Sequence, residues 1–251
     1  FRVLQVSHGW MPILFEKCER EEGYNPLKDN IEWQPAYESN KLGLRSEKDC
    51  TTSLEGLFAA GMARTLGINP FTGWSIASCT WSGYAAGESA GNHAENAPSG
   101  EIDLSDLKEK RRRFLAPLEN ENGEDPDALV HALQKILFPA HILIIMSEPN
   151  LRSALEKVVG LKREKLPQTK ASDLRTLIKT KETQTMFLSA EMTLRAALMR
   201  KETRESIYYR EDFKESDNLN WLKWIIVEKG KDGEMHFSTE DIPFDRYKFR
   251  P

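Results

Sequence analysis

Cysteine is scarce in this chain of 251 residues, and its few copies lie far apart. Cys18, Cys50 and Cys79 are odd in number and form no Cys-x-x-Cys pair. This excludes both a small secreted fold held by disulfides and a zinc site of clustered cysteines. The five histidines share no spacing typical of metal ligands. We therefore expect no metal site, and we expect a reducing, cytoplasmic location with contact to a membrane only through a partner.

The chain also lacks an excess of positive charge and any long hydrophobic run. Lys and Arg number 35 against 39 Asp and Glu, a formal net charge of −4, so no basic field is available for a nucleic-acid backbone. The longest apolar run, residues 136–146, is interrupted by Pro139 and His141 and is shorter than the ~20 residues of a spanning helix. We expect neither a nucleic-acid partner nor a membrane span.

The chain does not begin with methionine. Phe1 is followed at once by a strand-like run at residues 2–6, with no signal peptide or lipidation motif. This start is typical of a sequence whose first part is missing, so we expect further residues upstream.

Glycine, by contrast, is concentrated in the second fifth of the chain. Its spacing, together with the apolar pattern, predicts three successive elements. These are a short strand, a loop and a helix, over residues 54–60, 61–73 and 74–91.

The predicted helix has an unusual composition for a helix. Gly83, Gly87 and Gly91 recur at four-residue spacing, although each glycine costs about 1 kcal/mol relative to alanine. The cost indicates close packing against another backbone or a ligand, and the spacing does not decide between these two. The first turn presents the backbone N–H groups of Ser75 and Ile76 at the positive end of the helix dipole, which favours an anionic group.

The rest of the chain reads as a helical region followed by a β tail. Residues 92–100 and 120–126 are polar breaks typical of linkers. Apolar residues then recur at helical spacing over 127–204, where Pro149 and Pro167 divide the run into at least three helices. This pattern predicts a small antiparallel bundle.

The tail carries a hairpin signal. Asp232-Gly233 lies between two strand-like runs, which we place at 221–227 and 234–237. The fold class is therefore mixed α+β. We divide the chain into four segments, 1–49, 50–100, 101–213 and 214–251.

Two groups of motifs resemble those of one flavoprotein family. The first reads TSLEGLFAAG at 52–61, GWSI at 73–76 and SGYAAG at 82–87, and the second reads AALMRKETR at 196–204 and YREDF at 209–213. Their order and separation resemble the last FAD-binding segment and the C-terminal helical domain of succinate dehydrogenase, fumarate reductase and adenylylsulfate reductase flavoproteins. The resemblance implies the C-terminal part of an FAD-binding α/β domain, followed by a helical bundle and a β-hairpin tail.

The resemblance also implies a cofactor site. In the family, the matching positions Gly61, Met62, Gly73, Ser75 and Ile76 contact FAD. The N–H groups of Ser75 and Ile76 would meet the pyrimidine edge of the flavin, and Gly61 would lie beside the ribityl chain. The activity implied is that of an FAD-dependent oxidoreductase, which passes electrons between a substrate and a partner.

Three positions depart from the family pattern. Glu38 and Pro70 stand where the succinate and fumarate enzymes carry a substrate-binding His and Arg, so a dicarboxylate lacks its cationic clamp. Met62 stands where an acidic residue usually bonds the ribityl chain. We therefore expect a substrate other than succinate or fumarate, and the catalytic residues stay unassigned.

The sequence contains no GxGxxG, the motif that binds the FAD pyrophosphate in this family. We interpret the chain as the C-terminal part of a longer flavoprotein, whose N-terminal FAD and capping domains are its missing partners. Three scattered cysteines cannot ligate an iron–sulfur cluster, which takes about four thiolates. An iron–sulfur or ferredoxin-like subunit is thus the expected electron-transfer partner. The alternative is a non-catalytic helical interaction module or a degenerate flavoprotein remnant.

Several polar residues favour structural roles. Glu202, Arg204, Arg210 and Asp212 are expected to form an ion network that ties the tail to the bundle, rather than to act in catalysis. Cys79 is expected to be a small packed residue rather than a nucleophile.

Two surface features remain open. The basic run at 108–113 is typical of a solvated face, and it is also suited to an acidic patch on an electron-transfer partner. Trp221 and Trp224, three apart in a predicted strand, are expected to point to opposite faces, one into the core and one toward an interface.

Overall fold

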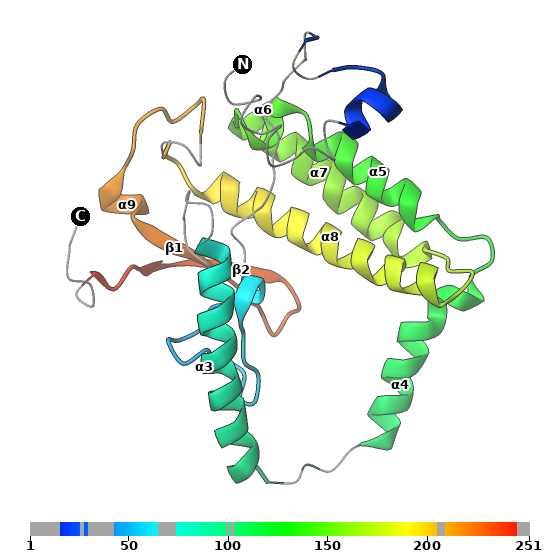
Figure 1. Ribbon diagram of the computed structural model, residues 1–251, viewed down its shortest axis with the longest axis vertical. Coiled ribbons are helices and arrows are strands. Elements are labelled where there is room, and N and C mark those ends of the chain that lie inside the picture. The colour runs from blue at the N-terminus through cyan, green and yellow to red at the C-terminus, as the bar shows by residue number, and fades with distance from the viewer. Residues whose placement is uncertain are drawn as a thin grey trace. The chain divides into compact units, whose positions relative to one another are not determined.

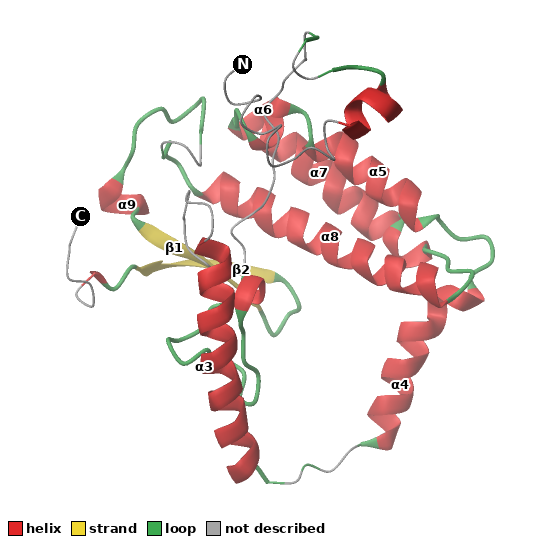
Figure 2. Ribbon diagram, viewed as in Figure 1, coloured by secondary structure: helices red, strands yellow, loops and turns green. Residues whose placement is uncertain are grey.

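Figures 1 and 2 show the fold of the chain in a computed structural model. The chain divides into two compact units, residues 1–36 and 37–251. The structure describes residues 16–25, 28–29, 43–64, 74–98, 100, 103–204 and 209–244.

In the first unit, the described residues contain a short helical stretch, η1, a π-helix over Cys18–Glu22. Gly23 ends it in the left-handed conformation, at φ 72°, and its N–H donates to the Cys18 carbonyl. Glycine adopts this conformation without a Cβ penalty, so Gly23 is a local signal in the sequence for the end of this stretch.

The first described residues of the second unit, 43–60, form irregular chain, and the strand predicted over 54–60 is wrong. Thr51 and Phe58 form one isolated antiparallel bridge, and the chain reverses between them. Gly56, at φ +76°, allows the reversal, and the Thr52 hydroxyl donates to the Leu57 carbonyl across it at 2.9 Å. The Leu57 carbonyl, which a strand would offer to a neighbouring strand, thus accepts its hydrogen bonds within the turn.

Two helical elements follow. A single 3₁₀ turn, η2, spans Gly61–Ala63, and the long helix α3 spans Trp74–Asn96. The helix extends past the predicted end at residue 91 into the segment expected to be a linker. The Asn96 side chain donates to the Asn92 carbonyl at 2.7 Å, so the polar residues of this last stretch serve the helix end.

The helical bundle is built from elements whose starts are set by proline and aspartate. Asp125 caps α5 through the Asp127 N–H, and Pro126 occupies its first turn, where a missing N–H costs nothing. Pro149 lies in the first turn of α7, and Asp173 forms a capping box with Thr176 at the start of α8. The prolines thus divide the region as predicted. The elements are α4 Leu104–Leu115, η3 Ala116–Glu119, α5 Pro126–Leu137, α6 Ala140–Leu143, α7 Glu148–Glu164, η4 Leu166–Gln168 and α8 Leu174–Met199.

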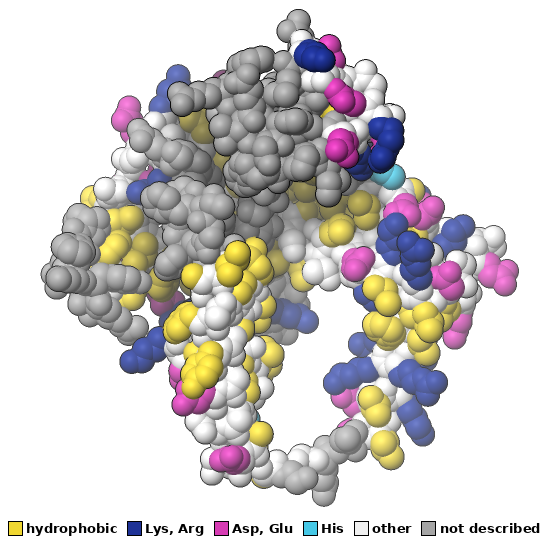
Figure 3. Space-filling view, in the orientation of Figure 1, with side chains coloured by type: hydrophobic (Ala, Val, Ile, Leu, Met, Phe, Trp, Pro, Cys, Tyr) yellow, Lys and Arg dark blue, Asp and Glu magenta, His cyan; other side chains and the backbone are white. Residues whose placement is uncertain are grey.

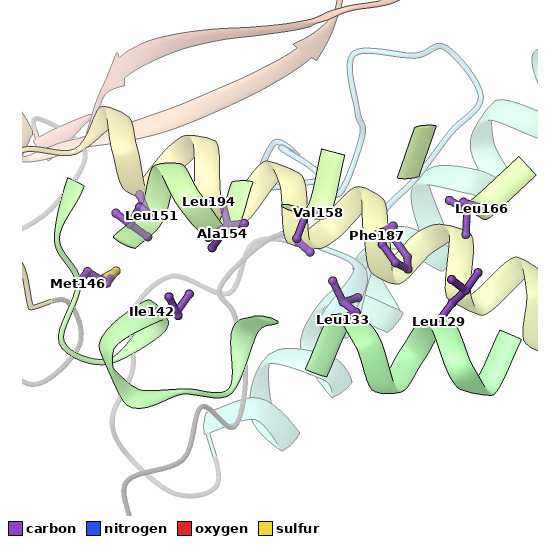
Figure 4. Close-up of a cluster of buried hydrophobic side chains, with 12 residues drawn as sticks. Leu129, Leu133, Ile142, Met146, Leu151, Ala154, Val158, Leu166, Phe187 and Leu194 are labelled. Carbon is purple, nitrogen blue, oxygen red and sulfur yellow. The ribbon is translucent and has the colours of Figure 1, made fainter. Parts of the chain in front are cut away.

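The hydrophobic core lies where α8 packs against both α5 and α7. Figure 4 shows Phe187 and Leu194 of α8 among Leu129, Leu133, Leu151 and Val158 from the other two helices. Buried Thr180 and Thr183 donate to backbone carbonyls of their own helix at 2.7 and 2.8 Å, so α8 can bury them without leaving a hydroxyl unsatisfied.

The tail forms the predicted hairpin with shifted bounds. A short helix, α9, spans Asn218–Trp221, and β1, Lys223–Lys229, pairs antiparallel with β2, Met235–Asp241. Val227 lies opposite Phe237 in this register.

The first predicted strand starts too early. The Asp217 carboxylate accepts the Asn220 N–H at 3.0 Å and begins a helical turn that Trp221 closes. Trp221 and Trp224 therefore do not share a strand, and the expectation of opposite strand faces is wrong.

The hairpin is held by two arginines. Arg200 donates to the Trp221 and Lys223 carbonyls at 2.7 and 2.9 Å. Arg45 donates to both carboxylate oxygens of Glu240 at 2.7 and 2.8 Å, which joins residues 43–64 to β2.

The architecture is thus mixed α+β, as predicted. Its division into the four segments 1–49, 50–100, 101–213 and 214–251 stays a prediction. Within the part of the chain that the structure describes, no helix is both long and apolar enough to span a bilayer.

Candidate functional site

The candidate site is built where η2 packs on α3. The Gly61 N–H donates to the Ser82 hydroxyl at 2.8 Å, and that hydroxyl donates to the Ser78 carbonyl at 2.5 Å. Gly61 has φ +58°, and a Cβ there would lie 3.2 Å from Cys79 Sγ. Glycine is therefore required by the backbone conformation and by the close approach of α3. Cys79 is half-buried against this turn, as expected for a packed residue.

The predicted contact residues are placed in part. Met62 and Ile76 are both described, and their side chains are 60% and 73% exposed. Ile76 lies in the first turn of α3, three residues before Cys79, so it is about one helical turn along the axis from the Gly61 contact. Ser75 is the second residue of the same turn. Gly73 lies outside the described residues.

The structure also places a cation beside this turn. The Arg64 guanidinium stacks over the Trp81 ring at 4.8 Å from its centroid, and Nη1 lies 3.8 Å from Cys50 Sγ. Arg64 Nε is buried and has no hydrogen-bond partner among the described residues. Arg64 belongs to no recognised motif, so pattern reasoning misses it. Its signal in the sequence is a single cation three residues after Gly61.

The three glycines of α3 do not show, among the described residues, the close packing that their spacing predicts. A Cβ added at Gly83, Gly87 or Gly91 would meet no described atom within 4 Å. The close packing that their spacing predicts is therefore not made with any described residue. Trp81 and Tyr84 are exposed on the same helix, so α3 offers a largely uncovered surface of small and aromatic residues.

The ion network predicted at the start of the tail is confirmed. Arg210 is fully buried and donates to both carboxylate oxygens of Asp212 at 2.7 Å. Glu202, also fully buried, accepts from Arg200 and Arg204 at 2.6 Å each. These groups are satisfied by one another and by backbone, which favours their structural role.

The network shifts the pKa of its carboxyl groups. Hydrogen bonds from Arg210 hold the pKa of Asp212 below its ordinary value. Burial raises the pKa of Glu202, but hydrogen bonds from Arg204 and from the Asp217 N–H outweigh it, so this pKa is also lowered. Both groups are therefore carboxylates at neutral pH and unsuited to act as general acids.

The remaining polar candidates form no centre. No group of three or more His, Cys, Asp or Glu among the described residues is arranged to hold a metal ion. Glu38 and Pro70 lie outside those residues.

Comparison with known proteins agrees with the motif resemblance. Residues 131–251 match the family model described as fumarate reductase flavoprotein C-term. The fumarate reductase flavoprotein subunit of Escherichia coli strain K12 is 24% identical over 246 residues, which cover 94% of this chain and 40% of that protein. The chain thus spans about two fifths of the length of this relative.

Two solved structures show the same fold. Quinol fumarate reductase of E. coli superposes with a TM-score of 0.84 at 22% identity, covering 98% of this chain and 43% of that one. Adenylylsulfate reductase from Archaeoglobus fulgidus has a TM-score of 0.68 at 27% identity, covering 80% and 34%. Residues 131–251, just under half of the chain, therefore match the fumarate reductase flavoprotein C-terminal family, and the chain as a whole is similar to the C-terminal portion of flavoproteins of the fumarate reductase and adenylylsulfate reductase type.

Proposed function

We propose that this chain is part of an FAD-dependent oxidoreductase and supplies the last protein segment that contacts the flavin. The observation that carries the proposal is the packing of η2 on α3 about one helical turn from Ile76, which lies in the first turn of that helix, with Met62 and Ile76 both exposed. The names of the relatives, which are flavoprotein subunits, support the same cofactor.

The residues present fit such a group. The N–H groups in the first turn of a helix have no acceptor within the helix, so Ser75 and Ile76 offer donors to an acceptor edge. The positive end of the α3 dipole stabilises negative charge that develops at that edge. Gly61 and Met62 would line the approach beside it. When bound, FAD would supply the two-electron redox chemistry, which no side chain of this segment provides.

The proposal extends to the substrate and the partner. We propose an electron donor or acceptor other than succinate or fumarate, because Glu38 and Pro70 stand at the two substrate-binding positions. The buried arginines of the network are engaged by Asp212 and Glu202, so they do not replace the missing clamp. An iron–sulfur or ferredoxin-like subunit is the proposed partner, since the three cysteines are far apart in the sequence.

A matched pair of variants tests the flavin contact in the native full-length protein. Ser75→Pro removes one amide donor, and a helix tolerates proline in its first turn, so α3 is expected to persist. Ser75→Ala keeps the amide. We expect Ser75→Pro to lose most of its flavin, read as visible absorbance per mole of protein, while Ser75→Ala retains it. Equal flavin occupancy in both variants would falsify the contact.

Turnover tests the substrate independently. The native protein is expected to reduce fumarate or oxidise succinate at less than about one hundredth of the rate with its own substrate, because a missing bidentate clamp costs several kcal/mol of binding. Fumarate turnover at an ordinary enzymatic rate would refute the substrate proposal and leave the flavin proposal intact.

One observation favours the second candidate function, a non-catalytic module or flavoprotein remnant. The backbone conformation of Gly61 and its contact with Cys79 explain this glycine without a ligand. A native product that is colourless after gentle purification, and that does not take up added FAD, would establish this alternative.

A further inference from the structure

Helix α4 is the least covered helix of the bundle region. None of its residues is buried, and among the described residues its C-terminal end packs on η3 and lies beside α8. Figure 3 shows hydrophobic and basic side chains interleaved along it. A helix with this composition and so little packing needs a further contact to be held in place.

The apolar residues of α4 lie on one face. Leu104, Leu107 and Phe114 are 65%, 50% and 48% exposed, and their spacing of three and seven residues sets them along one side of the helix. Arg111 lies on that side between Leu107 and Phe114, and Lys108 lies at its edge. The face is thus apolar with two cations set into it.

The other three cations of α4 lie away from the apolar face and are paired with carboxylates of the same helix. Lys110 pairs with Asp106 at 2.6 Å, on the flank of the helix. Arg112 and Arg113, on the opposite side, share Glu109 at 2.8 and 2.6 Å.

Lys108 and Arg111 differ from these three cations. Neither makes an ion pair with any described residue. Lys108 and Arg111 thus place two unpaired positive charges on the apolar face, against a net charge of one on the opposite side, where Arg112 and Arg113 share a single carboxylate.

The apolar face continues onto α8. The Lys181 ammonium lies 5.1 Å from the centroid of the Phe114 ring, which brings the two helices together. Leu174 and Ile178 precede Lys181 on the same side of α8 at helical spacing, and both are exposed. We call this the α4–α8 surface, made of Leu104, Leu107, Lys108, Arg111, Phe114, Leu174, Ile178 and Lys181.

We propose that the α4–α8 surface docks an acidic electron-transfer protein, a partner that presents carboxylates around an apolar centre. The proposal rests on the proposed function, which requires a redox partner. Its argument is charge complementarity: Lys108, Arg111 and Lys181 lie among exposed apolar side chains, so carboxylates can pair with them while the apolar groups are buried.

An anionic membrane fits this surface less well. Arg111 lies within the apolar face, so insertion into acyl chains would bury its charge without a partner. A protein surface can place a carboxylate at that position, where the guanidinium forms two parallel hydrogen bonds.

The test uses two charge-matched double variants of the native full-length protein. Lys108→Gln/Arg111→Gln removes two cations from the docking face, and Arg112→Gln/Arg113→Gln removes two from the opposite side. Binding to an acidic [2Fe–2S] ferredoxin, the probe, is measured by surface plasmon resonance. Ionic strengths of about 0.01 M and about 0.15 M are compared, between which the Debye length falls from about 30 to about 8 Å.

We expect the docking-face variant to slow association at low salt about tenfold and to flatten its salt dependence, while the control changes association less than about twofold. Equal losses in the two variants would overturn the proposal, because net charge alone would then explain binding. Absence of binding by the wild type would also overturn it.

Two further measurements identify a different occupant. Sedimentation of phosphatidylcholine vesicles containing phosphatidylserine tests a membrane, and analytical ultracentrifugation tests self-association. Loss of either interaction in the docking-face variant, without an effect on ferredoxin binding, would assign the surface to that occupant and refute ours. Flavin absorbance is read in every preparation, so flavin-free protein that still binds ferredoxin refutes the proposed function and leaves the docking surface intact.

Discussion

Arg210 and Asp212 meet in a parallel pair in which Nε and Nη2 of the arginine each donate to one carboxylate oxygen at 2.7 Å. Asp212 also accepts the N–H of Glu148, the first residue of α7, at 2.8 Å. Nη1 of Arg210 donates to the Ala197 and Arg200 carbonyls at the end of α8. A carboxylate thus sits at one helix N-terminus and a cation at one helix C-terminus, where the helix dipoles favour each.

Loss of the buried guanidinium is expected to be costly. Arg210→Gln removes the cation from Asp212 and leaves the α8 carbonyls without their donor, so the free energy of unfolding should fall by about 3–5 kcal/mol. Urea unfolding at neutral pH measures the change. Arg163→Gln, at an exposed arginine, is the control and should stay within about 0.5 kcal/mol of the wild type. A change at Arg210 as small as that of the control would show that the network adds little stability.

Stability should fall in acid because of the same carboxylates. The fold lowers the pKa of Asp212 and of Glu202 from the ordinary values of 3.8 and 4.5. Each carboxylate therefore stabilises the folded state fully when the pH is above that ordinary pKa. That contribution is lost as the pH falls through the lowered values. Unfolding curves between pH 7 and pH 3 should therefore show a loss below about pH 4.5. Asp212→Asn should make the acid dependence shallower, and an unchanged slope would contradict this assignment.

Two glycines are expected to respond in opposite directions to the same substitution. Gly61→Ala strains a backbone at φ +58° and crowds Cys79 Sγ, so it should destabilise the fold by at least about 1–2 kcal/mol. Gly83→Ala meets no described atom within 4 Å and lies inside α3, so it should stabilise by about 0.5–1 kcal/mol. Thermal unfolding of both variants is the measurement. A destabilising Gly83→Ala would reveal that another part of the native protein, or a ligand, covers this side of α3.

The bundle core should depend on Phe187. This residue is fully buried between α8 and its neighbours, so Phe187→Ala should cost about 3–5 kcal/mol through lost burial and the cavity left behind. Ile178→Ala, on the exposed side of the same helix, is the control and should cost less than about 1 kcal/mol. Denaturant midpoints at constant slope would measure both changes. Equal costs would indicate that Ile178 is covered in the native protein.

Local signals predicted the elements that depend on local chemistry. The hairpin loop follows from Asp232-Gly233, the helix divisions follow from Pro149 and Pro167, and the end of η1 follows from Gly23. Each position fixes its own backbone or removes a donor, so its effect does not depend on distant residues. The motif resemblance also rests on residue order along the chain, and the family model matches residues 131–251.

Errors arose where polar side chains competed for the backbone. The Thr52 hydroxyl and Gly56 formed a turn in place of the strand predicted over 54–60. Asp217 began a helical turn that took Trp221 out of its predicted strand. Both outcomes depend on hydrogen bonds whose geometry the apolar pattern does not encode.

For the candidate site, the sequence singled out Gly61 through the motif resemblance, and its pattern placed the start of a helix near Ser75. Only the tertiary structure decided why Gly61 is glycine, because the contact with Cys79 joins segments that the sequence separates by a loop. The same holds for Arg64 beside Cys50 and Trp81, and for the uncompensated charges of Lys108 and Arg111. Burial and ion pairing are properties of neighbours in space, and the fold alone chooses those neighbours.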